Sequence, residues 1–256
     1  MIAFDPAFLR KVYALLRRDI ASTFSDKGRA VEFFIFPVSF LTIWGLLLNS
    51  GTIDRALGSQ ILTINFLWSV GYSFQVHVNY PVAFDLWSGE LVGLLQEGVS
   101  HQVMATARAL FGLVAGAVIF VLGFLGVIFF FPVDAEYLLR LIQALPLVLA
   151  ASIGLGTGIN GVLYYLGRSY SFLSWTMMQF IIMFSSPFTP INALLLPVRT
   201  IAYLSPYSYA FEFIRGGQWS VYCIGTILSV MALIGGIKTH SYFYNLARKH
   251  GRLVTG

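Results

Sequence analysis

Six long apolar stretches dominate the chain, and each is close to the roughly 20 residues that a helix needs to cross the hydrocarbon core of a bilayer. The third is the most uniform, because no charged or amide side chain occurs between Ala109 and Phe131. We therefore predict an all-α polytopic membrane protein with six transmembrane helices in one domain, residues 1–256. The predicted spans lie at about 31–49, 58–80, 104–131, 138–166, 169–190 and 218–237.

The segment before the first span has a helical pattern of its own. Apolar residues recur at three- and four-residue steps over residues 6–24, and basic residues occupy the other side. Asp5 and Pro6 supply a cap and a first-turn proline. The segment is too charged to span the bilayer, so we predict that residues 1–30 form an amphipathic helix on the cytoplasmic membrane surface. We predict that residues 238–256 form a basic cytoplasmic tail.

Two connections between spans differ from ordinary loops. Residues 81–103 carry three acidic and no basic side chains, and their apolar pattern predicts a cytoplasmic helix from Ala83 to Gln96. Residues 187–217 contain four prolines, yet they are too apolar for a solvated loop. Short helices that enter the outer leaflet without crossing it would explain both features of this second segment.

Composition supports the membrane assignment. Only 11% of the residues are charged, against about a quarter in soluble domains, and the mean hydropathy is +0.78. The connections after the first, third and fifth predicted spans lie on the opposite side of the membrane from the N-terminus. Only four of the 16 Lys and Arg residues lie in or beside these connections, namely Arg55, Arg140, Arg199 and Arg215. Positive charge marks the cytoplasmic side, so both termini are predicted in the cytoplasm and the protein in the cell (inner) membrane. This distribution also explains the basic charge without nucleic-acid binding.

A polar stripe on the second predicted span is the first candidate site. Asn65, Trp68, Tyr72, Gln75 and Asn79 recur at alternating steps of three and four, so they share one helix face. Polar side chains within a span face a cavity or other helices. The stripe, together with Gln179 of the fifth span, therefore indicates either a translocation path or hydrogen bonding between packed helices, and in a dimer one face could do both.

The sequence offers two weak candidates for a catalytic or cofactor-binding motif. His77 and Asp85 could form a catalytic dyad, but a histidine that hydrogen-bonds at the membrane interface is the favoured interpretation. Gly154, Gly156 and Gly158 superficially resemble a dinucleotide loop, but with Gly161 they are more typical of close helix packing. We expect no enzymatic activity, no metal and no cofactor bound by this chain.

If the chain transports a substrate, it must obtain the energy for transport from another protein. The chain contains no GxxxxGK[ST] phosphate-binding loop. We also expect no buried charge cluster within a span, which disfavours an ion-coupled carrier. The acidic connection offers a contact for a soluble partner through an aromatic and several acidic and apolar side chains; the alternative is a helix that rests on lipid headgroups. The predicted contact residues are Asp85, Trp87, Glu90, Leu91 and Leu94.

The order of these parts resembles the membrane (permease) subunit of type-2 ABC exporters over nearly the whole chain. Residues 89–95 followed by Val99-Ser100 are similar to the family's Gly-x-Leu-Glu-x-Leu-Leu stretch. Arg108-Ala109-Leu110 resembles the usual opening of the third span. The closest similarity lies in the outer segment, with Pro187, Pro190, Leu196-Pro197, Ile201-Ala202, Ser205-Pro206-Tyr207 and Arg215. Val92, Gly98 and Ser205 depart from the family, which has Glu, Pro and Asn at these positions.

The resemblance implies a mechanism and partners. Two copies, as a homodimer, would surround a central path, and each would dock on a separate ATPase subunit that binds ATP and Mg. The helix at 83–96 would act as the coupling helix. The substrate would be an amphipathic, drug- or lipid-like molecule. The alternative is a polysaccharide or lipid-linked glycan exported by the same architecture, and an ion-coupled carrier or channel is less favoured.

Overall fold

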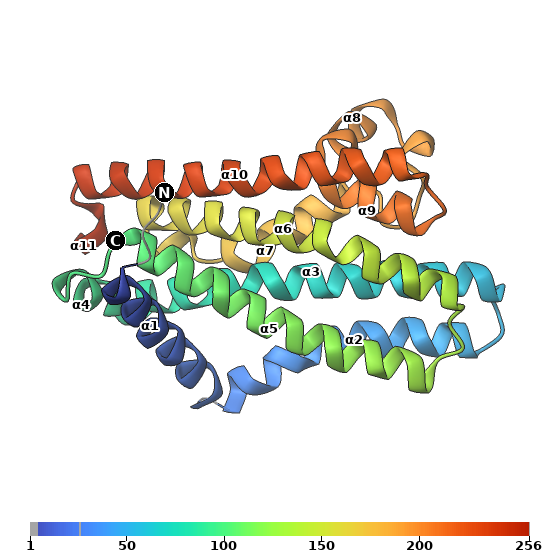
Figure 1. Ribbon diagram of the computed structural model, residues 1–256, viewed down its shortest axis with the longest axis horizontal. Helices are drawn as coiled ribbons and strands as arrows, with labels where there is room; N and C mark the ends of the chain where they lie inside the picture. The colour runs from blue at the N-terminus through green and yellow to red at the C-terminus, as the bar shows by residue number, and fades with distance from the viewer. Residues whose placement is uncertain (1–4, 26, 256) are drawn as a thin grey trace.

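The computed structural model describes residues 5–25 and 27–255, and within those ranges all regular structure is helical (Figure 1). The long helices lie side by side, and their direction along the bundle alternates. One end carries the first helix, the last helix and the short helix α4; we call it the α4 end. The other, the α8–α9 end, carries two short helices from the segment after α7.

By length and composition, three helices in the described part of the chain could each cross a membrane. They are α5 (His101–Phe130), α6 (Ala135–Leu166) and α10 (Trp219–Lys249). Helix α2 (Lys27–Asn49) contributes a shorter apolar section from Pro37 to Asn49. Helix α3 (Arg55–Ser88) is the longest, but polar side chains along it lower its hydropathy. These helices make the chain suited to a membrane, whereas the count of six spans stays a prediction.

Helix α1 (Pro6–Ser25) covers the predicted amphipathic segment. The Asp5 carboxylate accepts a hydrogen bond from the Ala7 amide at 3.0 Å, as the capping pattern predicts. Val12 and Leu15 are buried where α1 packs against α5. Asp19 and Thr23 continue the same buried face, so this face is less apolar than the sequence pattern alone indicated. Its position at a membrane surface stays a prediction.

The predicted single helix from Ala83 to Gln96 is wrong. Helix α3 continues through Ser88, and the separate helix α4 runs over Glu90–Gln96. Gly89 between them has φ 78°, a left-handed conformation that ends α3. Glycine adopts this conformation without a steric penalty, which explains why the break falls there.

The predicted fifth span does not form one helix. After a 3₁₀ turn at Arg168–Tyr170, α7 covers only Leu173–Met183, or 11 residues. Ser186 has φ 61° and precedes Pro187, and a residue before proline is disfavoured in a helix. The Arg215 guanidinium donates to the carbonyls of Ser186 and Pro187, both at 2.6 Å. These bonds satisfy backbone groups that the missing helix would otherwise satisfy.

The segment after α7 returns along the bundle end through short elements. A 3₁₀ turn at Ile191–Ala193 is followed by α8 (Leu196–Leu204) and α9 (Pro206–Ile214). Glu212 connects them to the irregular segment, because its carboxylate accepts from the Ile191 amide at 2.8 Å and from Arg215 at 3.0 Å. Whether α8 and α9 enter a membrane leaflet stays a prediction.

Helix α10 extends past the end of the predicted sixth span at residue 237. It runs to Lys249 without a glycine or proline after Gly236, and α11 (Arg252–Thr255) follows. Residues 238–249 of the predicted basic tail therefore continue this helix, and the cytoplasmic placement of residues 238–256 stays a prediction. Favourable helix formers such as Leu246 and Ala247 continue the helix.

Glycines bring α6 and α10 into close contact. A Cβ atom built on Gly236 would lie 1.8 Å from the carbonyl oxygen of Gly154, and one on Gly161 would lie 2.4 Å from the His240 Cα. Gly156 instead faces α3, where a Cβ would lie 2.9 Å from the Cβ of Val78. The interpretation of these glycines as packing residues is confirmed.

Candidate functional site

The polar face of α3 joins three helices through buried amide side chains. Asn79 donates to the Gly156 carbonyl and to the Asn160 side-chain oxygen, each at 2.6 Å. Asn160 donates back to the Val78 carbonyl at 2.9 Å. Gln75 donates to Asn79 and, at 2.7 Å, to the Ser174 carbonyl in the first turn of α7. Gln75 and Asn79 are fully buried, so this part of the stripe packs helices together.

The remaining stripe residues have different surroundings. Asn65 is buried, and its amide donates to the Ile61 carbonyl of its own helix at 2.8 Å. Trp68 is partly buried between Phe40 and Phe188, with ring centroids 5.4 and 6.5 Å away. Tyr72 and, on α7, Gln179 are also partly buried. A role of these residues in a translocation path stays a prediction.

A cluster of charged side chains lies at the α4 end, and it is the feature that sequence reasoning missed. Asp85 of α3 forms ion pairs with Arg108 of α5 and, at 2.8 Å, with Arg18 of α1. Arg18 also pairs with Asp19 at 2.8 Å, and the Arg108 Nε lies 3.7 Å from the second Asp19 oxygen. We call Arg18, Asp19, Asp85 and Arg108 the ion cluster.

The ion cluster is electrically balanced, and three of its four side chains are shielded from solvent, whereas the Arg18 side chain is 30% exposed. The side chains of Asp85 and Arg108 have no exposed surface, and that of Asp19 is 1% exposed. The Tyr164 hydroxyl adds a partner, because Arg108 donates to it at 2.7 Å. Two positive and two negative groups compensate one another, as buried charges require. Of the four residues only Arg108 falls within a predicted span, so the cluster does not contradict the expectation that the spans contain no buried charge cluster.

Helix α1 contributes Arg18 and Asp19 to the ion cluster, and the surroundings of these two groups raise the pKa of each. Burial raises the pKa of the Asp19 carboxyl, and the neighbouring Arg108 and Arg18 guanidinium groups offset only part of that effect. Burial alone would lower the pKa of Arg18, but the Asp85 and Asp19 carboxylates outweigh it and raise the pKa. The ion cluster thus attaches α1 to the ends of α3 and α5.

The catalytic alternative, a dyad of His77 and Asp85, is not what the structure brings together. The two Asp85 oxygens face Arg108 and Arg18. The His77 Nδ1 lies 2.6 Å from the Ser73 carbonyl, and its ring contacts Phe111 edge-on. His77 is therefore a buried residue of helix packing.

The five predicted partner-contact residues divide into two groups. Asp85, Leu91 and Leu94 are buried within the chain, so in this arrangement they do not face a partner. The Trp87 side chain is accessible, with 65% of the residue exposed, and the Glu90 side chain is 49% exposed. The surface that a partner could reach at this end therefore centres on Trp87 and Glu90.

Trp87 and Glu90 are also connected to their surroundings. The Trp87 indole N–H donates to the Ser171 hydroxyl at 2.6 Å, next to an open cavity of about 480 Å³ that Tyr80, Phe84 and Trp175 also line. Glu90 lies 3.5 Å from Arg18 of the ion cluster. An external contact at these two residues would thus act directly on the turn that precedes α7 and on the ion cluster.

One sequence signal could have identified part of the cluster. Asp19 lies four residues after Leu15 and seven after Val12, so it belongs to the apolar face of α1 rather than to its basic side. Asp85 and Arg108 gave no such signal, because 23 residues separate them and only the packing of α3 on α5 brings them together. Within residues 5–25 and 27–255, no group of three or more His, Cys, Asp and Glu is placed to hold a metal ion.

Comparison with known proteins adds no assignment, because the chain matches no family model and no curated protein. The resemblance to type-2 ABC permeases stays a prediction.

Proposed function

We propose that the chain is the membrane subunit of an ATP-driven exporter, and that a separate ATPase subunit drives it through contact with Trp87 and Glu90. The proposal rests on three apolar helices long enough to span a bilayer and on an exposed contact surface at one bundle end. The resemblance of the sequence to type-2 ABC permeases supports it as well.

In this proposal the chain crosses the membrane six times. Helices α2, α3, α5, α6, α7 and α10 run in alternating directions between the two ends (Figure 1). Helix α7 alone would be about 16 Å long, so the irregular residues after it would complete that crossing. Four arginines lie at the α8–α9 end: Arg55 begins α3, Arg140 lies in the second turn of α6, Arg199 lies within α8, and Arg215 directly follows α9. The positive-inside rule then assigns the α4 end to the cytoplasm.

The observation that carries the proposal is the coupling of the exposed surface to the bundle. Leu91 and Leu94 bury α4 in a core that also contains Val12 of α1, Met104 of α5 and Tyr244 of α10. The ion cluster adds charged contacts between α1, α3 and α5. Movement of α4 by a partner would therefore be transmitted to several long helices at once.

The ion cluster does not favour an ion-coupled carrier. Its residues lie near the end of α3 and the start of α5, and its two aspartates are compensated by its two arginines. A transported cation would need carboxylates that are available to it. For the substrate, we propose an amphipathic drug- or lipid-like molecule and a homodimer of this chain; export of a polysaccharide or lipid-linked glycan is the alternative within the same architecture.

A binding experiment tests the partner contact. The purified chain would be titrated with the ATPase subunit that copurifies with it, and Trp87→Ala is expected to weaken binding about thirtyfold, as for a tryptophan at an interface hot spot. Trp219→Ala is the matched control, because Trp219 is 62% exposed and begins α10 at the opposite end. An equal effect of both substitutions would contradict the assignment of this surface.

A further inference from the structure

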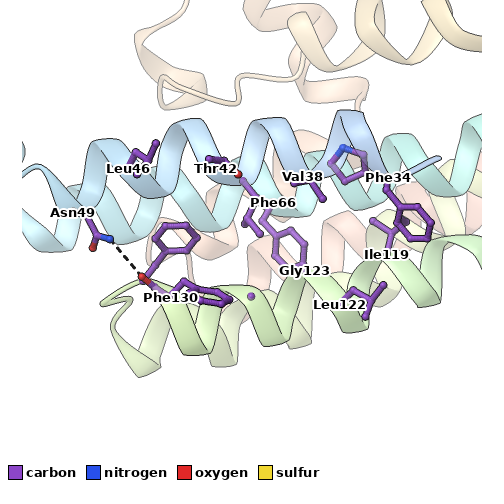
Figure 2. A pocket seen from close by; sticks show the side chains of 14 residues that line it. Phe34, Val38, Thr42, Leu46, Asn49, Phe66, Ile119, Leu122, Gly123 and Phe130 are labelled. Atoms are coloured by element: carbon purple, nitrogen blue, oxygen red, sulfur yellow. Dashed lines mark hydrogen bonds between the residues drawn. The ribbon is translucent and has the colours of Figure 1, made fainter. Parts of the chain in front are cut away.

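A long apolar groove lies between α2 and α5, with α3 as its floor (Figure 2). Its volume is about 500 Å³. Phe34 marks one end, beside Ile119, and Asn49 and Phe130 mark the other. The Phe66 side chain of α3 lies between α2 and α5, near Gly123. The groove belongs neither to the polar stripe nor to the ion cluster.

The chemistry of the lining excludes water as a stable occupant. Among the 14 lining residues that the structure describes, none is charged, and Thr42 and Asn49 are the polar ones. The Asn49 amide already donates to the Phe130 carbonyl at 3.4 Å. A buried water needs two to four polar partners, and apolar cavities stay dry. An empty groove of this size would lose dispersion contacts along its whole length.

Glycines on α5 keep the groove open. A Cβ on Gly123 would lie 2.4 Å from the Phe66 ring, so this position leaves room for that ring. A Cβ on Gly126 would meet a single atom within 4 Å, the Leu41 Cδ2 at 3.4 Å. A larger side chain at Gly126 would therefore extend into the groove.

The dimensions fit a single thin chain. The lining extends over residues 34–49 of α2 and 119–131 on and just after α5, which corresponds to about 20 Å along the helix axes. One leaflet of hydrocarbon is about 15 Å deep. The groove is thus long enough for one lipid tail, and it is continuous with the exposed apolar flank of α5, including Leu122 and Leu125.

We propose that this groove binds one acyl chain of a bilayer lipid, which completes the packing between α2 and α5. Helix α5 is apolar and long enough to span a bilayer, so lipid tails would surround it. Lipid tails are both apolar and thin, as an occupant of this groove must be. The proposal requires the chain to lie in a membrane, but it does not depend on an ATPase partner or on transport.

Photocrosslinking tests the proposal directly. The full-length chain would be reconstituted in phosphatidylcholine vesicles that contain a trace of the same lipid with a diazirine on its acyl chain. After illumination, crosslinked residues would be mapped by mass spectrometry. We expect Val38, which lines the groove, to be labelled about tenfold more than Leu125, which is lipid-facing but outside it.

Two matched variants separate the groove from the general lipid surface. Leu122→Trp, at a lining position that is 53% exposed, is expected to reduce labelling of Val38 about tenfold. Leu125→Trp, at a non-lining position that is 44% exposed, should leave that labelling unchanged. Gly126→Leu fills the groove from its α5 side and should act like Leu122→Trp.

Three results would overturn the proposal. The first is equal labelling of Val38 and Leu125 in the wild-type chain. The second is labelling of Val38 that stays unchanged in both Leu122→Trp and Gly126→Leu. The third is displacement of the lipid label by a transported substrate, which would assign the groove to substrate. Loss of ATPase binding would leave this proposal standing, because the assay contains no ATPase.

Discussion

Removal of Asp85 is expected to destabilise the protein strongly. Asp85→Ala deletes the carboxylate that pairs with both Arg18 and Arg108. The Arg108 guanidinium would then remain fully buried, with the Tyr164 hydroxyl at 2.7 Å and a more distant Asp19 oxygen at 3.7 Å. Breaking a buried ion pair by removing one partner costs about 3–5 kcal/mol, because the remaining charge is uncompensated.

Glu90→Ala is the matched control for this prediction. Glu90 also faces an arginine of the cluster, at 3.5 Å, but its side chain is 49% exposed. Pairs of this kind contribute about 0–1 kcal/mol, because solvent screens them. The free energy of unfolding of each purified variant would be measured by denaturant titration in detergent, with the helical circular dichroism signal as the probe.

A second variant tests the physical reason. In Asp85→Ala/Arg108→Ala both charges of one pair are removed, so the double variant should lose less free energy of unfolding than the two single variants together. The reasoning is refuted if Asp85→Ala costs as little as Glu90→Ala, or if the two single effects simply add.

Two further predictions concern helix packing and use the same unfolding assay. Gly236→Val should cost about 3 kcal/mol or more, because its Cβ would collide with the Gly154 carbonyl, whereas Gly235→Val, with nothing within 4 Å, should cost little; similar losses would contradict the proposed close approach. Asn79→Leu should cost about 1–3 kcal/mol, because Asn160 loses a buried partner. If Asn79→Leu loses transport but keeps its stability, Asn79 would instead be assigned to the translocation path.

The sequence predicted the features that depend on local pattern. The apolar stretches gave the positions of the long helices, and the spacing of Gly154 and Gly161 predicted close helix contact. The amide groups at Gln75 and Asn79 were correctly identified as a polar face, with hydrogen bonding between helices as one of the two interpretations. Each of these features is carried by residues within a few turns of one helix.

Features that depend on packing were not predictable in the same way. The pairing of Asp85 with Arg108 requires α3 and α5 to be adjacent, which no local pattern specifies. Hydropathy also suggested a continuous fifth span, although Pro187 and the conformation of Ser186 end helical structure. The break at Gly89 was missed because the apolar pattern continues across it.

If a separate ATPase drives this chain through its α4 end, transport requires both proteins. The most direct measurement is transport of an amphipathic substrate in vesicles that contain the chain with or without the copurified ATPase. ATP-dependent transport is expected only when both subunits are present, and Trp87→Ala should reduce it. Transport by the chain alone, driven by an ion gradient, would rule out an ATPase-driven mechanism.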